Sequence, residues 1–200
     1  MCSSLYATLV DPFLRDIRLF VPGFAGMKAG DRALDVGCGT GDQALHYAAR
    51  GIEAYGIDID PVMIAQADRS MRKRRLKAFF SVQDAAALSF EDGSFDFVTT
   101  TLALHEKDAG LQDAVLSEMR RVTREGGSLV LVDFSVPLPR NAAGLFMRSV
   151  EFLVGGEHYR NFRGFKGSGG LDGLLKRNGL EPQKAAFLKS GAITALKVAA

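Results

Sequence analysis

An apolar run that leads directly into three closely spaced glycines, Leu34–Gly41 (LDVGCGTG), most constrains what this chain can fold into. Arg32–Val36 has the pattern of the end of a buried strand. Gly37, Gly39 and Gly41 then let the backbone turn tightly and approach a ligand where any Cβ would collide. The residues after Gly41 begin a helix, whose first N–H groups are free and carry partial positive charge. Strand, turn and helix together predict a nucleotide-sized site.

Strand and helix patterns alternate from Asp31 onward, which predicts a parallel sheet with helices on both faces. The predicted strands cover Ala33–Val36, Ala54–Ile57, Ala78–Val82, Phe95–Thr100, Ser128–Phe134, Gln183–Leu188 and Ala192–Val198. The predicted helices cover Gly41–Arg50, a segment starting at Pro61, Ala109–Thr123, Ala142–Val154 and Leu171–Arg177. Gly126-Gly127 is expected to end the helix before the fifth strand.

Length and composition predict one domain over residues 1–200, because 47% of the 200 residues are apolar. Within it, residues 1–30 are expected to form an N-terminal helical cap and residues 140–178 an acceptor-side helix or lid region. Two scattered cysteines and the lack of a signal or membrane-spanning pattern predict a cytoplasmic protein. The net charge of +2 demands no anionic partner, and the basic run at residues 72–77 lacks interleaved aromatic residues, so no nucleic-acid partner is expected.

Acidic residues follow the predicted strands at the sheet edge where ligands bind in such folds. Asp58 follows the second strand, and its carboxylate, with about four lone-pair sites, suits a ribose diol. Asp60 precedes Pro61 and is expected to cap a helix instead. Asp84 follows the third strand and could accept from the amine of a base or simply form a turn.

Four ordered motifs resemble those of class I S-adenosylmethionine-dependent methyltransferases. They are LDVGCGTG, GIDIDPVMI at 56–64, QDAAALSFEDGSFDFV at 83–98 and LSEMRRVTREGGSLVLVDF at 116–134. Together they cover about half the chain, and the sub-type resembled includes the ubiquinone/menaquinone-biosynthesis methyltransferases. The resemblance implies a three-layer α/β Rossmann-like sheet of about seven strands, mostly parallel, with an antiparallel last strand.

The resemblance also implies roles in binding S-adenosylmethionine, with S-adenosylhomocysteine as the product. The cofactor-binding residues by this pattern are Asp35, Gly37, Cys38, Gly39, Gly41, Asp58, Ile59, Asp84, Ala85 and Thr101. Asp35 would orient the amino group, the glycines would wrap the methionine part, Ile59 would pack on the adenine, and Asp84 with Ala85 would read the adenine edge. Cys38 is expected to be packed rather than reactive.

His105 ends the fourth strand near the expected acceptor and is the candidate catalytic base, with a structural role as the alternative. The segment Gly155–Gly170, rich in glycine, polar and aromatic residues, is open to two interpretations: an acceptor-binding lid or a plain connecting loop. The substrate-side candidates are Tyr6, His105, His158, Tyr159 and Phe162. No spacing of ligands in the sequence predicts a metal site.

Methyl transfer to a small-molecule acceptor, hydrophobic or quinone-like, is therefore the predicted function, carried out by a monomer or homodimer. One alternative is a non-catalytic regulatory protein that binds S-adenosylmethionine. A nicotinamide-dependent oxidoreductase is disfavoured, because Asp42 stands where the G-x-G-x-x-G motif of dinucleotide-binding proteins has its third glycine. A phospholipid head group is a second acceptor class that the residues leave open.

Overall fold

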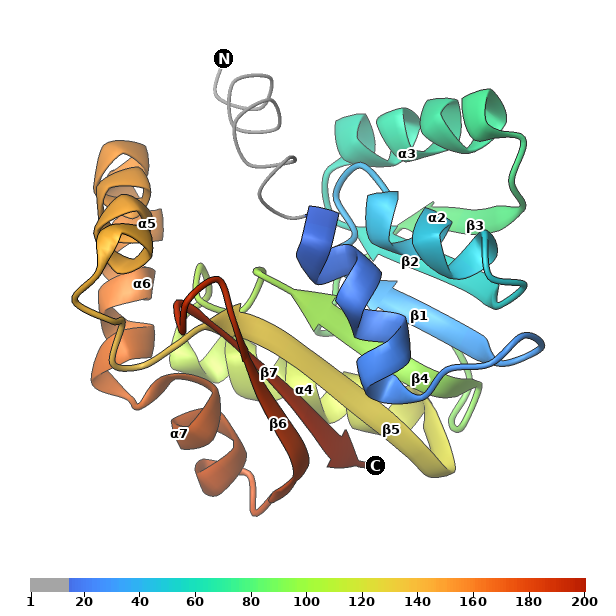
Figure 1. Cartoon of the computed structure of the whole chain (residues 1–200). Coiled ribbons are helices and arrows are strands. Elements are labelled where there is room, and N and C mark those ends of the chain that lie inside the picture. The colour runs from blue at the N-terminus through green and yellow to red at the C-terminus, as the bar shows by residue number, and fades with distance from the viewer. Residues whose placement is uncertain (1–14) are drawn as a thin grey trace.

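The computed structural model describes residues 15–200 as a seven-stranded sheet surrounded by helices (Figure 1). The strands are β1 (Arg32–Val36), β2 (Glu53–Asp58), β3 (Ala78–Val82), β4 (Phe95–Thr101), β5 (Thr123–Phe134), β6 (Pro182–Leu188) and β7 (Ile193–Ala199). The helices are residues 15–25, α2 (Asp42–Ala48), α3 (Pro61–Arg74), α4 (Ala109–Val122), α5 (Ala142–Val154), α6 (Gly156–Gly167) and α7 (Gly170–Arg177). The predicted α/β Rossmann-like class is confirmed.

The strand order is β3-β2-β1-β4-β5-β7-β6. β1 to β5 pair in parallel, whereas β7 is antiparallel to both β5 and β6, so the predicted reversed last strand is confirmed. The strand order reverses between β1 and β4, which are paired to each other. Ligands of open α/β sheets bind beyond the carboxyl ends of the strands at such a switch point.

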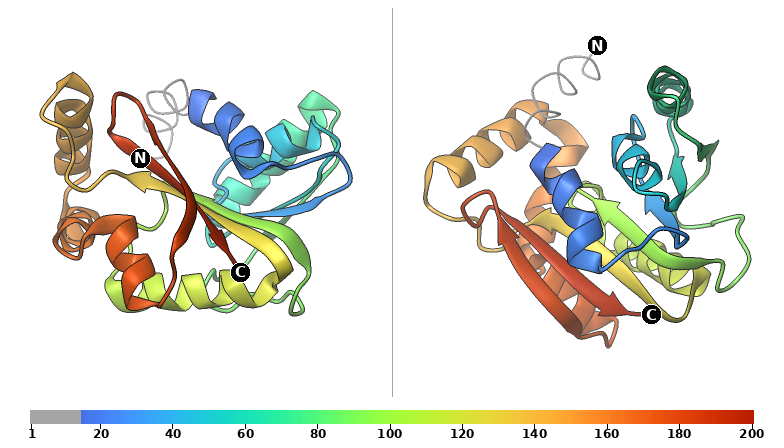
Figure 2. Two further views of the ribbon diagram at one scale, coloured as in Figure 1. Left: turned by 60° about the horizontal axis from the view of Figure 1, so that its bottom comes forward. Right: turned by 45° about the vertical axis from the view of Figure 1, so that its right-hand side comes forward.

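Helices cover the sheet on both faces (Figure 2). The helix of residues 15–25 lies with α2 and α3 on one face, and α4 and α7 lie on the other. β5 is buried at every position from 127 to 134, as a strand covered on both faces must be. The apolar run that it carries therefore forms the centre of the hydrophobic core.

Helix starts follow the sequence signals closely. Asp60 accepts a hydrogen bond from the Val62 N–H at 2.8 Å, and Pro61 occupies the first turn of α3, so the predicted cap is confirmed. Asp108 and Asn141 cap α4 and α5 in the same way. Each cap satisfies a backbone donor that the helix leaves free.

Gly126-Gly127 does not separate a helix from a strand, so this prediction was wrong. β5 begins already at Thr123, which pairs with Phe95 of β4. A Cβ on Gly127 would lie 2.7–2.8 Å from the Thr123 side chain and from the carbonyl oxygens of Arg124 and Asp96. Gly127 is thus required for close packing at an irregular start of the strand.

The segment Gly155–Gly170 contains the helix α6, so it is not a plain connecting loop, and its role as a lid stays a prediction. Phe162 and Phe165, three residues apart, are 0% and 1% exposed and anchor one face of this helix in the core. Gly155 and Gly169, with φ of +68° and +89°, stand at its two ends. The glycines that suggested an irregular loop therefore delimit a helix, whose burial outweighs its weak helix propensity.

The helix of residues 15–25 is hydrogen-bonded to the last two strands of the sheet, β6 and β7. Its side chains Ile17 and Val21 are fully buried. Lys184 and Lys197, from β6 and β7, donate to the carbonyls of Phe24 and Ala25 at the end of this helix. Tyr6 and the rest of the predicted cap before residue 15 lie outside the described residues. Across residues 15–200, no helix combines the length and the apolar character needed to cross a bilayer.

Candidate active site

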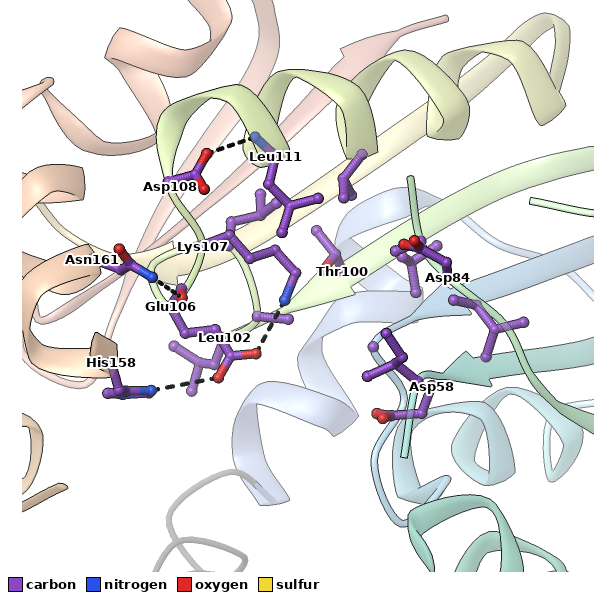
Figure 3. Close-up of a pocket in the computed structure, with 18 of the residues that line it drawn as sticks. Asp58, Asp84, Thr100, Leu102, Glu106, Lys107, Asp108, Leu111, His158 and Asn161 are labelled. Carbon is purple, nitrogen blue, oxygen red and sulfur yellow. Dashed lines mark hydrogen bonds and ion pairs between the residues drawn. The ribbon is translucent and has the colours of Figure 1, made fainter. Parts of the chain in front are cut away.

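A cleft of about 530 Å³ opens at the carboxyl ends of β1, β2 and β4, within the usual size range of small-molecule sites. Its two ends differ in chemistry (Figure 3). Asp58 and Asp84 stand at one end, whereas Glu106, His158 and Asn161 stand at the other. We call the first the cofactor end and the second the acceptor end, after the roles that the sequence predicts for them.

Asp58 lies on the wall of the cofactor end and holds the glycine turn. Its Oδ2 accepts from the Gly39 N–H at 2.8 Å, and its Oδ1 accepts from the Asp60 N–H at 3.0 Å. Two of the roughly four lone-pair sites of the carboxylate remain for a ligand. The Asp58 carboxylate, which is predicted to accept hydrogen bonds from a ribose, is thus oriented by the same turn that is expected to hold the rest of the cofactor.

The three glycines of the turn have different surroundings, although all have positive φ. Gly37 lines the cleft, and a Cβ there would lie 3.0 Å from Ala103. A Cβ on Gly39 would meet nothing within 4 Å, whereas one on Gly41 would lie 2.6 Å from the Phe80 ring. Gly41 therefore serves packing behind the cleft, whereas the space into which a Cβ of Gly39 would project is open.

Asp35 and Cys38 are buried behind the turn. Thr99 Oγ1 lies 3.0 Å from Asp35 Oδ1, and burial raises the pKa of Asp35 to about 7. Burial also raises the pKa of the Cys38 thiol, which is consistent with the predicted packing role. The N–H groups of Gly37 and Cys38 donate to the Ile57 carbonyl, so they hold the turn against β2.

Ile59, Asp84 and Ala85 line the cleft at the same end as Asp58, and their roles in binding a cofactor stay predictions. Ile59 is 71% exposed, an apolar surface available to a flat ring. Asp84 accepts from the Ala86 N–H at 2.9 Å, so it forms the predicted turn while still facing the cleft. Thr100 lines the cleft instead of Thr101, because side chains alternate along β4, and its buried hydroxyl has no partner among the described residues.

The acceptor end combines an apolar wall with a polar rim. Leu102, Ala103, Leu104, Leu111 and Val115 form the apolar wall. On the rim, Asn161 of α6 donates to the Glu106 carbonyl at 2.8 Å, and His158 Nδ1 lies 3.6 Å from the Glu106 carboxylate. Because α6 supplies this rim, the helix closes one end of the cleft.

Among the described substrate-side candidates, only His158 lines the cleft. His105 is 1% exposed, and its Nδ1 lies 2.7 Å from Asp133 Oδ1. Burial by itself lowers the pKa of His105, but Asp133 outweighs it and the pKa is raised. Phe162 packs in the core against Phe134, and Tyr159 packs edge-on against Phe152. These three residues lie behind the acceptor end.

Glu151 of α5 is a neighbour of this group that sequence reasoning missed. It is 0% exposed, and its Oε2 lies 2.6 Å from His158 Nε2. Its only signal in the sequence is its occurrence as a single acid in an otherwise largely apolar segment, AAGLFMRSVEFLV. Such a position predicts an exposed charge unless its partners are known.

Residues 33–127 match a family model described as a methyltransferase domain. The resemblance of the chain to S-adenosylmethionine-dependent methyltransferases is therefore confirmed. A demethylmenaquinone methyltransferase of Thermus thermophilus is 41% identical over 135 residues, covering 64% of this chain and 60% of that protein. A 27-O-demethylrifamycin SV methyltransferase of Amycolatopsis mediterranei is 36% identical over 121 residues, covering 58% of this chain and 44% of that protein.

The chain thus spans about half the length of these curated relatives. The fold has a full-length counterpart in the crystal structure of an S-adenosylmethionine-dependent methyltransferase from Aquifex aeolicus. The TM-score is 0.72 at 19% identity, and the match covers 99% of this chain and 98% of that one. The described residues therefore adopt a known fold.

Proposed function

We propose that this protein transfers a methyl group from S-adenosylmethionine to a small, largely apolar acceptor. The observation that carries the proposal is Asp58, whose carboxylate lies on the cleft wall with lone pairs left over, next to the open space at Gly39. A ribose diol fits the carboxylate, and a ligand chain fits where a Cβ would otherwise project. The match of residues 33–127 to a methyltransferase domain supports the same conclusion.

S-adenosylmethionine, when bound, supplies an electrophilic methyl group that an acceptor atom takes by in-line displacement. The residues of the chain then have three tasks: to bind, to align and to exclude water. Asp58 and the glycine turn bind at one end of the cleft. Leu102, Ala103 and Leu104, which belong to the apolar wall, exclude water from the cleft. No strong stabilisation of developing charge is required, because charge disperses as the methyl group moves.

For the acceptor, we propose a quinol-like ring or another flat molecule with an oxygen at its edge. The apolar wall would contact the ring, and the rim of Glu106, His158 and Asn161 would hydrogen-bond to the oxygen. The relative from Thermus thermophilus is named for a reaction on demethylmenaquinone, and the relative from Amycolatopsis is named for an O-methylation. The first name gives a quinone precursor as the acceptor of that relative, and the second gives an oxygen as the methylated atom, so we keep carbon and oxygen as the two possible methylated atoms.

We propose a positioning role for His105, because its ring lies buried behind His158 and outside the cleft wall. A general base must come within hydrogen-bond reach of the proton it removes. His105 instead shares its Nδ1 with Asp133, so it can act on an acceptor only through the arrangement of its neighbours.

Calorimetric titration of the full chain tests the cofactor. We expect binding of S-adenosylmethionine and S-adenosylhomocysteine and none of reduced nicotinamide nucleotide. Transfer of labelled methyl groups to a series of demethylated quinols, phenols and phosphoethanolamine then tests the acceptor. Tight binding with no transfer to any compound of a broad metabolite extract would favour the regulatory alternative. A failure to bind either sulfur compound would overturn the proposal.

A further inference from the structure

Three side chains of metal-ligand type meet just behind the acceptor end of the cleft. They are His105 from the segment after β4, Glu151 from α5 and His158 from α6. One candidate ligand atom from each lies within 4.8 Å of the others. Because they come from three separate elements, no short motif in the sequence could have indicated them.

Two of the ligand atoms are buried without a hydrogen-bond partner among the described residues. They are His105 Nε2 and Glu151 Oε1, which lie 3.8 Å apart in side chains only 1% exposed. Leaving such groups unpaired is costly in a protein interior. Their separation is too long for a hydrogen bond, but it is short enough for one ion between them to bond to both atoms at the roughly 2.0–2.2 Å of a zinc–nitrogen or zinc–oxygen bond. One cation between them would satisfy both atoms.

Asp133 directs the free nitrogen of His105 toward this gap. Its carboxylate accepts from the backbone N–H groups of Leu104, His105 and Phe134, and its Oδ1 lies 2.7 Å from His105 Nδ1. A carboxylate in this position sets the tautomer and the ring orientation of a metal-binding histidine. A divalent cation would also balance two carboxylates, Asp133 and Glu151, that are both fully buried.

We propose that His105, Glu151 and His158 bind one divalent transition-metal ion of the zinc class, with Asp133 orienting His105. Two imidazoles and one carboxylate form a ligand set that suits zinc or ferrous iron and leaves a further coordination position open. Magnesium and calcium are disfavoured because they prefer oxygen ligands. On binding the ion, His158 would give up its hydrogen bond to Glu151 and coordinate the ion instead. Because His158 lines the cleft, the ion would lie at the edge of the acceptor end.

The test uses the full chain, stripped with a chelator and without cofactor, so that its result is independent of methyl transfer. Zn²⁺ is titrated by calorimetry, and Co²⁺ is titrated by visible absorption, which reports the ligand geometry. We expect one ion per chain. His158→Ala should weaken Zn²⁺ binding by more than the roughly 10–100-fold that loss of a ligand-orienting partner costs. Glu151→Gln should do the same.

His46→Ala is the matched control, because His46 also lies beside a carboxylate, Asp42 at 3.5 Å, with nearly the same side-chain exposure as His158. Its Zn²⁺ affinity should equal that of the wild type. The proposal fails if no ion binds at stoichiometric concentration, or if His158→Ala leaves the affinity unchanged. If Glu151→Gln does not fold, His158→Ala still tests the proposal. The side chain of His158 is partly exposed, so its truncation is expected to leave the fold intact.

Discussion

At the scale of single residues, Asp58 shows how one carboxylate can serve both the fold and a ligand. It accepts two backbone N–H groups, and these bonds connect the glycine turn to the start of α3. The acid could be predicted because it stands at the carboxyl end of β2, the strand next to β1. Its bond to Gly39 could not be predicted, since it depends on how the turn folds back over β2.

Asp58→Ala should weaken S-adenosylhomocysteine binding by about 1–3 kcal/mol, because a hydrogen-bonding carboxylate is lost from the site. Calorimetric titration measures the change. Asp60→Ala is the control: it removes a nearby acid that caps α3 through Val62 and does not line the cleft. Equal affinities of wild type and Asp58→Ala would remove Asp58 from the site.

Asp35 predicts a pH dependence of stability. Burial raises its pKa from 3.8 in a model peptide to about 7 in the folded protein. The folded state therefore keeps a proton that the unfolded chain has already lost. The stability from this group is complete below about pH 4 and is lost as the pH rises through about 7.

Asp35→Asn removes this titration, so its free energy of unfolding, relative to the wild type, should rise between pH 4 and pH 7. Urea unfolding across that range provides the measurement. A constant difference between variant and wild type would show that Asp35 does not titrate in this window.

At the scale of elements, α6 shows the limit of reading helices from composition. The glycines and polar residues of its sequence favour a loop, and only contacts with the core stabilise the helix. Phe162 provides one of them, since it packs against Phe134 and is fully buried. A sequence indicates that a phenylalanine is apolar but not which distant strand it meets.

Phe162→Ala should lower the free energy of unfolding by about 3–5 kcal/mol, because a fully buried ring is replaced by a cavity. Leu153→Ala is the comparison: Leu153 is 81% exposed, so its truncation should have little effect. Both values come from urea unfolding. Similar small effects for the two variants would contradict the placement of Phe162 in the core.

At the scale of the whole molecule, sheet and cleft follow from patterns that are local and repeated. The strand–turn–helix unit at Leu34–Gly41 and the acids after β2 and β3 predicted the edge of the sheet at which the cleft opens. The acceptor end could not be predicted, because it combines the segment after β4 with α6, and nothing in the sequence places those elements together. Glu151 was missed for the same reason. The start of β5 directly after α4 was missed because it depends on the pairing of Thr123 with Phe95 of β4.

S-adenosylhomocysteine should stabilise the whole chain against unfolding. At a ligand concentration of 100 times Kd, the expected gain is about 2.7 kcal/mol. Thermal or urea unfolding with and without the ligand measures it, and Asp58→Ala at the same ligand concentration should gain less. No stabilisation of the wild type at saturating ligand would contradict binding to the native state.

Two lysines, one in β6 and one in β7, donate to the end of the helix of residues 15–25. These contacts have a consequence for the order in which the chain folds during synthesis. That helix emerges from the ribosome long before Lys184 and Lys197 are added. The carbonyls of Phe24 and Ala25 must wait for these two lysines, whereas Gln43 and Arg50, which donate to other carbonyls of the same helix, are synthesised much earlier. The nascent chain can thus place this helix beside α2 early and fix the end of the helix last.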